Sequence, residues 1–395
     1  AYSDHKYTIG KDKKPSSFSL NGTWKFNQSK NYDTCFKFFY NTEFNDANWN
    51  DIQVPGHIQL QGFDNPHYTD VTYPWDGHDV VKAGQIDMDK NKVYQYRKTF
   101  DLPQDFIGNK LILSFEGVES NIYVWLNGKF IGYSEDSFTP SRFDITKYTQ
   151  EKDNVLSVRI FQKCTGTWLE DQDMWRFSGI FRDVMIYKQP SQHIQDLKID
   201  TNIDLDTKKS ILTCTCKMSS NESHILQAKL YDPQGNIVWN GNMQDTFEIP
   251  VENTSLWSSE YPNLYQLEIV LYDANNEIIE TIQEQVGFRK FTLEYGIMKL
   301  NGKRIVFHGI NRHEWNAKTG RAITYEQMEE DIHILKSLNI NAVRTSHYPN
   351  NSYWYKLCDQ YGIYVIDEMN LEPHGANDII PQNNTEWTDC LLDSA

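Results

Sequence analysis

A change in hydrophobic periodicity near residue 287 constrains the fold of this chain more than any other feature. Before that point, short runs of β-branched and aromatic residues are separated by turns, which predicts β-sheet. Beyond it, apolar residues recur at helical spacing and alternate with short apolar runs, which predicts βαβ units around a parallel sheet. The 395 residues also exceed what one hydrophobic core usually serves, so two or three domains are expected.

Residues 1–190 are predicted to form a jelly-roll β-sandwich without a helix of ordinary length. The predicted strands lie at 24–26, 93–100, 111–115, 122–126, 130–133 and 155–161. The dipeptide Asn127-Gly128 is the strongest hairpin signal in the sequence, because a type I′ turn needs positive φ at both central residues.

Residues 191–288 are predicted to form an immunoglobulin-like sandwich, a kind of domain that usually acts as a spacer. Its predicted strands lie at 211–216, 225–231, 237–239 and 264–272. Cys214 and Cys216 alternate within one strand and therefore share a face. We interpret them as core residues rather than as metal ligands, and no residue of this domain is a candidate for catalysis.

Residues 289–395 are predicted to form the first three βα units of a (β/α)8 barrel. The predicted strands lie at 304–309, 340–344 and 363–367, the first of them buried. One helix follows a capping box at Thr324-Tyr-Glu-Gln327, and a second, at 352–361, ends at Gly362. A closed barrel of eight units needs about 250 residues, so we expect a truncated barrel. Its open edge should favour self-association, or disorder or proteolytic sensitivity after about Gly287.

Charge and composition exclude several classes of partner. The net charge of −16 and the lack of a Lys or Arg run argue against nucleic acid. No stretch approaches the 18 to 20 or so apolar residues of a membrane helix, and the first residues lack an apolar signal core. The six cysteines are scattered, which predicts free thiols in a cytoplasmic protein.

Polar side chains follow all three predicted barrel strands, where the active sites of such barrels lie. Asn311-Arg-His-Glu314 follows the first strand, Arg344 and His347 follow the second, and Glu372 and His374 follow the third. Three such strand ends favour a site over ordinary polar loops. Arg and His can donate hydrogen bonds to sugar hydroxyls or hold a carboxylate. Glu372 and His374 can share Mg²⁺ or Mn²⁺ if further oxygen ligands are present.

Two unusual segments of the first domain, Asn65 to Pro74 and Trp168 to Gly179, look like loops. The second contains Asp171 and Asp173 between tryptophans. Carboxylates beside an aromatic surface can orient a polyhydroxyl ligand. Alternatively, the aspartates form a structural network that caps the end of the sandwich, and the sequence leaves both interpretations open.

These residues resemble the large β-galactosidases of glycoside hydrolase family 2. The segments that carry the resemblance are Leu20-Asn-Gly-Thr-Trp-Lys-Phe26, Val54-Pro-Gly-His57, Tyr68-Thr-Asp-Val-Thr-Tyr-Pro74, Glu170-Asp-Gln-Asp-Met-Trp-Arg-Phe-Ser-Gly-Ile-Phe-Arg-Asp183, Gly309-Ile-Asn-Arg-His-Glu314, Val343-Arg-Thr-Ser-His-Tyr-Pro-Asn350 and Asp367-Glu-Met-Asn-Leu-Glu-Pro-His-Gly375. The resemblance spans nearly the whole chain, and Glu-Asp-Gln-Asp-Met-Trp favours the galactosidase branch over the glucuronidase and mannosidase relatives. It implies retaining hydrolysis of terminal β-D-galactosides such as lactose by the full-length protein.

The resemblance also implies roles for individual residues in sugar binding. Asp173 matches an aspartate that contacts the galactosyl hydroxyls and an associated Na⁺. Asp70 stands where the family has an asparagine near the sugar, which puts its role in doubt. His313 and His347 match histidines that act on the sugar hydroxyls in the transition state, and Arg344 matches an arginine that steadies the nucleophile.

Glu372 and His374 match two Mg²⁺ ligands of the family. The third ligand there is the acid/base glutamate, and neither it nor the nucleophile has a counterpart in this sequence. A retaining mechanism needs two carboxyl groups about 5 to 5.5 Å apart, so this chain alone is expected to be inactive. We expect a homo-oligomer or a complementing C-terminal polypeptide. The alternative is a carbohydrate-binding protein without catalysis.

Overall fold

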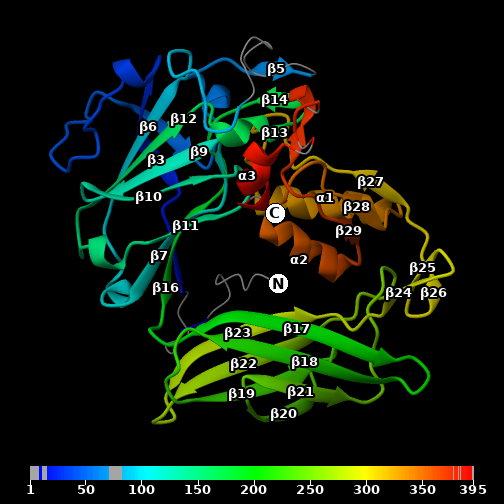
Figure 1. Ribbon diagram of the computed structural model, residues 1–395. Coiled ribbons are helices and arrows are strands. Elements are labelled where there is room, and N and C mark those ends of the chain that lie inside the picture. Colours follow the sequence, from blue (N-terminus) through cyan, green and yellow to red (C-terminus); the bar gives the residue numbers. More distant parts are fainter. Residues whose placement is uncertain are drawn as a thin grey trace.

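The computed structural model describes residues 9–10, 16–70, 82–376, 378–380, 382 and 384–393. Figure 1 shows three bodies: a first sandwich coloured blue to green, a second sandwich below it in green and yellow, and a smaller orange and red body beside the first. The first six residues and residues 71–74, which entered the sequence argument, lie outside the described part of the chain.

The first sandwich is the predicted jelly roll. One sheet has the order β10-β9-β12-β6-β3-β4 and the other the order β11-β7-β16-β2. The strands are β2 (Ser17–Ser19), β3 (Gly22–Ser29), β4 (Asn50–Val54), β6 (Val93–Phe100), β7 (Lys110–Phe115), β9 (Asn121–Leu126), β10 (Lys129–Glu135), β11 (Ser141–Asp144), β12 (Asn154–Phe161) and β16 (Val184–Gln189). Every predicted strand is present, and the helices in this described region are all short 3-10 turns.

Local turn chemistry fixes the strand register in the first sandwich. Asn127 and Gly128 have φ values of 50° and 79°, and Leu126 pairs with Lys129 across the turn. Both residues adopt the positive φ that a type I′ turn needs, so the hairpin prediction is confirmed. Trp24, Phe26 and Tyr96 are among the buried side chains that fill the space between the sheets.

The second sandwich contains three strands that the sequence analysis did not find, β17, β21 and β23. Its strands are β17 (Ile194–Asp204), β18 (Lys209–Met218), β19 (His224–Tyr231), β20 (Ile237–Met243), β21 (Thr246–Val251), β22 (Tyr265–Asp273) and β23 (Ile278–Val286). Cys214 and Cys216 are both buried in its core, which confirms their packing role. The first described strand, β1 (Ile9–Gly10), pairs with β23 and so joins this sandwich.

The third body has the predicted parallel βαβαβ order. Its elements are β27 (Gly309–Asn311), α1 (Tyr325–Ser337), β28 (Ala342–Arg344), α2 (Ser352–Tyr361) and β29 (Tyr364–Ile366). β28 pairs in parallel with both other strands. Thr324 and Gln327 form the capping box, and Gly362 ends α2 in the left-handed conformation, so both helix-end predictions are confirmed.

The prediction of a buried strand at 304–309 is wrong. A hairpin of β24 (Phe291–Glu294), β25 (Ile297–Leu300) and β26 (Lys303–Arg304) comes first, and 305–308 have no regular structure. The parallel strand begins only at Gly309, at the edge of the sheet. Val306, Phe307 and Ile310 are exposed because no described element covers this edge.

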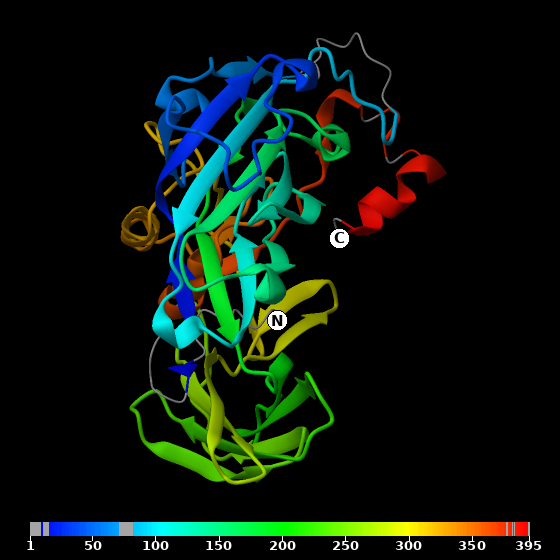
Figure 2. The ribbon, with the colours of Figure 1, turned by 90° about the vertical axis from the view of Figure 1, so that its left-hand side faces the viewer.

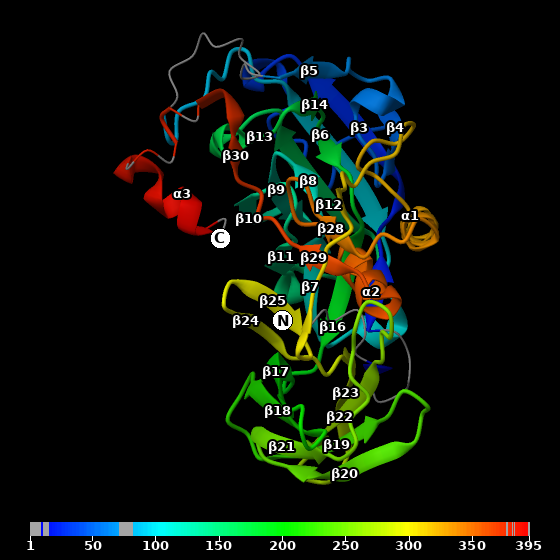
Figure 3. The same cartoon turned by 90° about the vertical axis from the view of Figure 1, so that its right-hand side faces the viewer.

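Helix α3 (Thr388–Asp393) lies away from α1 and α2. Figures 2 and 3 show it beside the loops of the first sandwich. There Trp168 and Leu169 of the first sandwich pack with Ala376, Ile380 and Trp387. No helix in the described ranges is long and apolar enough to cross a membrane.

Candidate active site

Loops of the first sandwich meet the carboxyl end of the barrel strands. β13 (Glu170–Asp171) pairs in parallel with β30 (Glu372–Pro373), which follows β29 of the barrel. β14 (Met174–Arg176) pairs antiparallel with β5 (His67–Thr69). The two segments interpreted as loops thus pair with each other, and one of them also pairs with the barrel segment that carries Glu372 and His374 (Figure 3).

The two aspartates of the acidic segment have different surroundings. Asp171 is fully buried, forms an ion pair with Arg176 and accepts a hydrogen bond from the Gly375 N–H at 2.9 Å. Burial raises the pKa of Asp171 to about 6, although the Arg176 charge acts in the opposite direction. Asp173 is exposed. Both interpretations therefore apply, since Asp171 is a structural residue and Asp173 is open to a ligand.

Asp173 lies beside an exposed aromatic surface. The Tyr68 hydroxyl donates a hydrogen bond to the Asp173 carboxylate, and this bond raises the pKa of Tyr68. The rings of Tyr68 and Trp175 are 5.7 Å apart, and they are 49% and 42% exposed. Rings open to this extent can stack against the apolar face of a sugar. The sequence analysis identified the two segments that contain Tyr68 and Trp175, but it did not predict these two rings as site residues.

The two histidines at the barrel strand ends face each other. The rings of His313, after β27, and His347, after β28, are 5.6 Å apart. Loss of water contact lowers the pKa of His313, and the neighbouring His347 lowers it further. The Asp173 carboxylate acts in the opposite direction. The sandwich carboxylate and the barrel imidazoles are therefore close enough to interact electrostatically.

Glu368 joins the side chains of Arg344 and His347. Arg344 Nε donates to Glu368 Oε1, and His347 Nδ1 lies 3.1 Å from Glu368 Oε2. The same His347 nitrogen is 3.1 Å from Arg344 Nη2. A single ring nitrogen cannot accept from the guanidinium and donate to the carboxylate at once, so the proton on Nδ1 decides which contact forms. Glu368 was not among the site residues predicted from the sequence, although it directly follows a predicted strand.

The candidate metal ligands form a chain of close contacts. Glu372 Oε1 is 3.6 Å from His374 Nδ1, and Glu372 Oε2 is 3.7 Å from His347 Nδ1. His374 Nε2 is 3.5 Å from Asp70 Oδ1. Within the described ranges, no group of three or more His, Cys, Asp or Glu side chains is arranged to hold a metal ion. The pair supplies one carboxylate and one imidazole, a donor set that suits Mg²⁺ when further oxygen ligands complete it.

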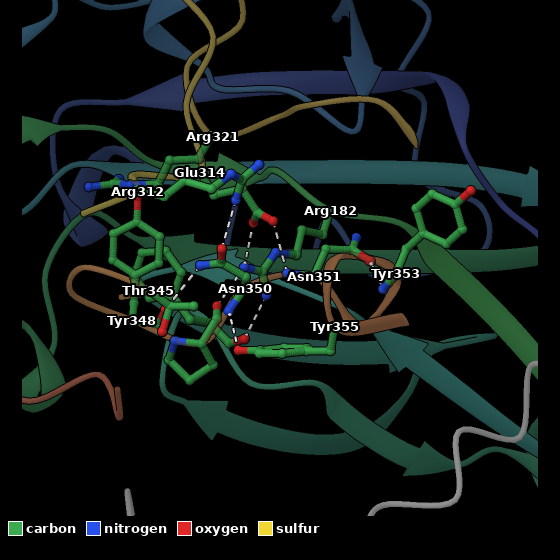
Figure 4. Close-up of polar contacts among 12 residues, drawn as sticks. Arg182, Arg312, Glu314, Arg321, Thr345, Tyr348, Asn350, Asn351, Tyr353 and Tyr355 are labelled. Carbon is green, nitrogen blue, oxygen red and sulfur yellow. Dashed lines mark hydrogen bonds and ion pairs between the residues drawn. The ribbon is translucent and has the colours of Figure 1, made fainter. Parts of the chain in front are cut away.

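Glu314 serves the interface between the first sandwich and the barrel. It is buried, its Oε2 accepts from Arg182 Nη2 at 2.7 Å, and its Oε1 accepts from the Asn351 N–H at 2.9 Å. Arg182 also donates to the carbonyl oxygens of Phe138 and Pro349, at 2.7 and 2.8 Å. Figure 4 shows Glu314 enclosed by this network. Both oxygens are engaged inside the protein, so Glu314 is not open to a ligand.

Three family models match consecutive parts of the chain. "Glycosyl hydrolases family 2, sugar binding domain" matches residues 18–190, "Glycosyl hydrolases family 2" matches 192–289, and "Glycosyl hydrolases family 2, TIM barrel domain" matches 291–394. Two sandwiches followed by barrel units, with polar groups at the strand ends, define the class as a multidomain glycosidase. The chain belongs to glycosyl hydrolase family 2.

Curated relatives agree with this family. The chain is 49% identical over its whole length to a β-galactosidase of Halalkalibacterium halodurans and 45% identical over 95% of its length to one of Clostridium acetobutylicum. It spans only 41% and 42% of these relatives. It is also 42% identical over its whole length to the β-galactosidase large subunit of Leuconostoc lactis, of which it covers 68%.

Solved structures share the fold. A β-glucuronidase from Ruminococcus gnavus in complex with D-glucuronic acid superposes with a TM-score of 0.75 at 22% identity, over 93% of this chain and 61% of that one. A β-glycosidase from Bacteroides vulgatus gives a TM-score of 0.72 at 24% identity, over 89% of this chain and 44% of that one.

Proposed function

We propose that this chain supplies the sugar-binding part of a retaining β-galactosidase that hydrolyses terminal β-D-galactosides such as lactose. One observation carries the proposal. The exposed Asp173 carboxylate lies beside the open rings of Tyr68 and Trp175 in the first sandwich. It also lies near the polar groups at the barrel strand ends, which include an imidazole, a guanidinium and a carboxylate. Polar groups of both signs next to an aromatic surface suit a polyhydroxyl ligand. The names of the relatives support galactose as the sugar.

In this proposal the exposed polar groups bind the galactosyl hydroxyls. The residues assigned to binding are Asp70, Asp173, His313 and His347. Arg344 orients the nucleophilic carboxylate, which this chain does not supply. Asp70 lies next to His374, and its negative charge distinguishes it from the asparagine of the family pattern.

The proposal includes two cations. Glu372 and His374 would hold Mg²⁺ together with a carboxylate that this chain does not supply, and Asp173 would hold Na⁺ near the sugar. When bound, each cation supplies positive charge that fixes carboxylate and hydroxyl oxygens. Suitable metal ligands are the exposed carboxylate of Asp173 and the side chains of Glu372 and His374, which lie next to each other.

The acid/base and nucleophilic glutamates of the family have no counterpart in this chain. We propose that they come from a longer polypeptide or from a second chain, in line with the large-subunit names of some relatives. The complete protein is proposed to be cytoplasmic and to form a homo-oligomer or a complex with the complementing chain.

The test is hydrolysis of a chromogenic β-galactoside by this chain, alone and after mixing with a C-terminal polypeptide of the family that contains both glutamates. We expect no hydrolysis alone and clear hydrolysis after mixing. Asp173→Asn should lower kcat/KM in the mixture about 10- to 100-fold, because a hydrogen bond to a charged group is worth about 1.5 to 3 kcal/mol. The exposed Asp206→Asn in the second sandwich is the control.

Two outcomes would contradict the proposal. Hydrolysis by the chain alone would mean that Glu368 or Glu372 is catalytic. Galactoside binding that never leads to hydrolysis, with any complementing chain of the family, would favour a carbohydrate-binding protein without catalysis.

A further inference from the structure

The barrel segment that carries Glu372 and His374 is held by the first sandwich. The Glu372 N–H donates to the Leu169 carbonyl at 2.8 Å, and the Gly375 N–H donates to Asp171 Oδ2 at 2.9 Å. These bonds flank the short parallel strand pair β13 and β30. The backbone on both sides of His374 is therefore tied to a different domain from the one that carries it.

Asp171 and Arg176 also connect this barrel segment to residues 67–70 of the first sandwich. Arg176 pairs with Asp171, and its Nε donates to the Thr69 hydroxyl at 2.8 Å. Thr69 lies between Tyr68 and Asp70, and β5 pairs with β14. One buried ion pair thus contacts both the segment of Tyr68 and Asp70 and the segment of Glu372 and His374.

A second buried contact fixes the start of the same barrel segment. Gln172 Nε2 donates to Asn370 Oδ1 at 2.6 Å, and both side chains are buried. Asn370 Nδ2 lies 3.4 Å from Asp136 Oδ1, also in the first sandwich. Residues 370–375 are consequently held at both ends by polar groups outside the barrel.

We propose that Asp171 is a positioning residue that sets the placement of Glu372 and His374 relative to Tyr68 and Asp173. It is fully buried, so it acts through Arg176 and the Gly375 N–H and does not touch the sugar. Its effect on sugar binding and on the cation rests on the proposed function, whereas its effect on the placement of the two segments does not.

The chemistry of the contact requires a carboxylate. One oxygen faces the Arg176 guanidinium while the other accepts the Gly375 N–H, so both roles need an acceptor. An amide at this position has one acceptor oxygen and presents an NH₂ group to one of the two donors. It also removes the negative charge that Asp171 presents to the largely buried Arg176 guanidinium, which is unfavourable.

Hydrogen–deuterium exchange on the 395-residue chain tests the placement directly. Asp171→Asn should raise exchange about tenfold in peptides covering 67–70 and 369–376, because both segments lose their shared contact, and leave the second sandwich unchanged. The matched control is Glu280→Gln, since Glu280 is also a buried carboxylate that accepts a backbone N–H, from Ile194 at 2.9 Å. The control should leave 67–70 and 369–376 as in the wild type.

A double variant separates positioning from simple charge balance. Asp171→Asn with Arg176→Met removes both members of the ion pair, so overall stability should recover relative to the single variant while exchange at 369–376 stays fast. Slow exchange at 369–376 in the single or the double variant would overturn the proposal. If the variants do not fold, hydrogen exchange of the wild-type chain tests the proposal. The proposal would be overturned if amides 372–376 exchanged as fast as those of the exposed turn at 318–319.

Activity of the complemented protein adds a separate readout. Asp171→Asn should raise the half-saturating Mg²⁺ concentration and KM about tenfold or more, whereas Glu280→Gln should change neither. If the wild-type mixture is inactive, the proposed function fails while the exchange result stands. If exchange rises but KM and the Mg²⁺ requirement do not change, the residue positions the segments without affecting the site, and that part of the proposal is wrong.

Discussion

Glu314 and Glu368 follow the two outer strands of the barrel sheet, β27 and β29, yet they have opposite surroundings. Glu314 is 0% exposed and is engaged by Arg182 and the Asn351 N–H. Glu368 is partly open and contacts Arg344 and His347. Sequence position alone does not separate them, because Arg182 comes from another domain. Because of this difference in burial and contacts, we infer that Glu314 stabilises the interface between the first sandwich and the barrel, whereas Glu368 belongs to the candidate site.

Removing either partner of the Arg182–Glu314 pair should be costly. Glu314→Gln or Arg182→Met is expected to lower stability by about 3 to 5 kcal/mol, because each change leaves a buried charge without its partner. Urea unfolding followed by tryptophan fluorescence measures the loss. The exposed pair Lys299–Glu294 is the control, and Lys299→Met should cost less than about 1 kcal/mol. Equal losses for the two pairs would contradict this account.

The sequence allowed part of the site to be predicted. His313, Arg344 and His347 follow adjacent parallel strands, whose carboxyl ends necessarily meet at one edge, and the structure places His347 close to both other residues. The burial of Asp171 could not be predicted, since it depends on Gly375, which is 204 residues away. Contacts across domains leave no periodic signal in the sequence.

At the scale of elements, helix ends were predictable but their tertiary contacts were not. Gly362 ends α2 at a φ of 72°, as the helical pattern predicted. The structure adds that a Cβ on Gly362 would overlap the carbonyl of Ser259 in the second sandwich. The same glycine therefore ends a barrel helix and allows close approach of a neighbouring domain.

Gly362→Ala should destabilise the protein more than Gly296→Ala does. Both glycines have positive φ, which costs about 1 kcal/mol for alanine, but a Cβ at Gly296 meets nothing within 4 Å. The additional loss at Gly362, expected to exceed about 1 kcal/mol, reports the contact with Ser259. Thermal unfolding of the two variants measures the difference. Equal losses would show that Ser259 moves aside freely.

Glu280 on β23 should make the second sandwich sensitive to pH. Burial raises its pKa to about 7, and the Ile194 N–H only partly offsets this. The unfolded chain loses this proton near pH 4.5, so stability is fully present below that pH and falls by about 3 kcal/mol as the pH rises to about 7. Glu280→Gln should remove this loss, whereas the exposed Glu248→Gln should not. Parallel stability curves for wild type and Glu280→Gln between pH 4.5 and 8 would contradict this.

Most strands were predictable because alternation and turn residues mark them, as for β6 and the Asn127-Gly128 hairpin. β13 and β30 could not be predicted, since each has two residues and exists only through the other. The predicted strand at 304–309 failed because its apolar residues lie in an exposed connection before an edge strand.

At the scale of the molecule, the three-stranded parallel sheet leaves apolar side chains uncovered. Val306, Phe307, Ile310 and Ile366 are 39–59% exposed. We expect the 395-residue chain to self-associate through these uncovered side chains, with a mass that rises with concentration in light scattering. Ile366→Lys should reduce the association, and Ile225→Lys, at an exposed position of the second sandwich, should not. A monodisperse wild-type monomer would contradict the prediction.

The bond between Asp171 and Gly375 also has a consequence for biosynthesis. Domains generally fold as units in the order in which they leave the ribosome. The first sandwich can therefore be complete while its acidic segment still lacks the strand that will pair with it 200 residues later. A nascent chain arrested before residue 372 would present Asp171 and Arg176 without their barrel partner. The site is thus among the last features of this chain to form, and its assembly reports that translation has passed the third barrel strand.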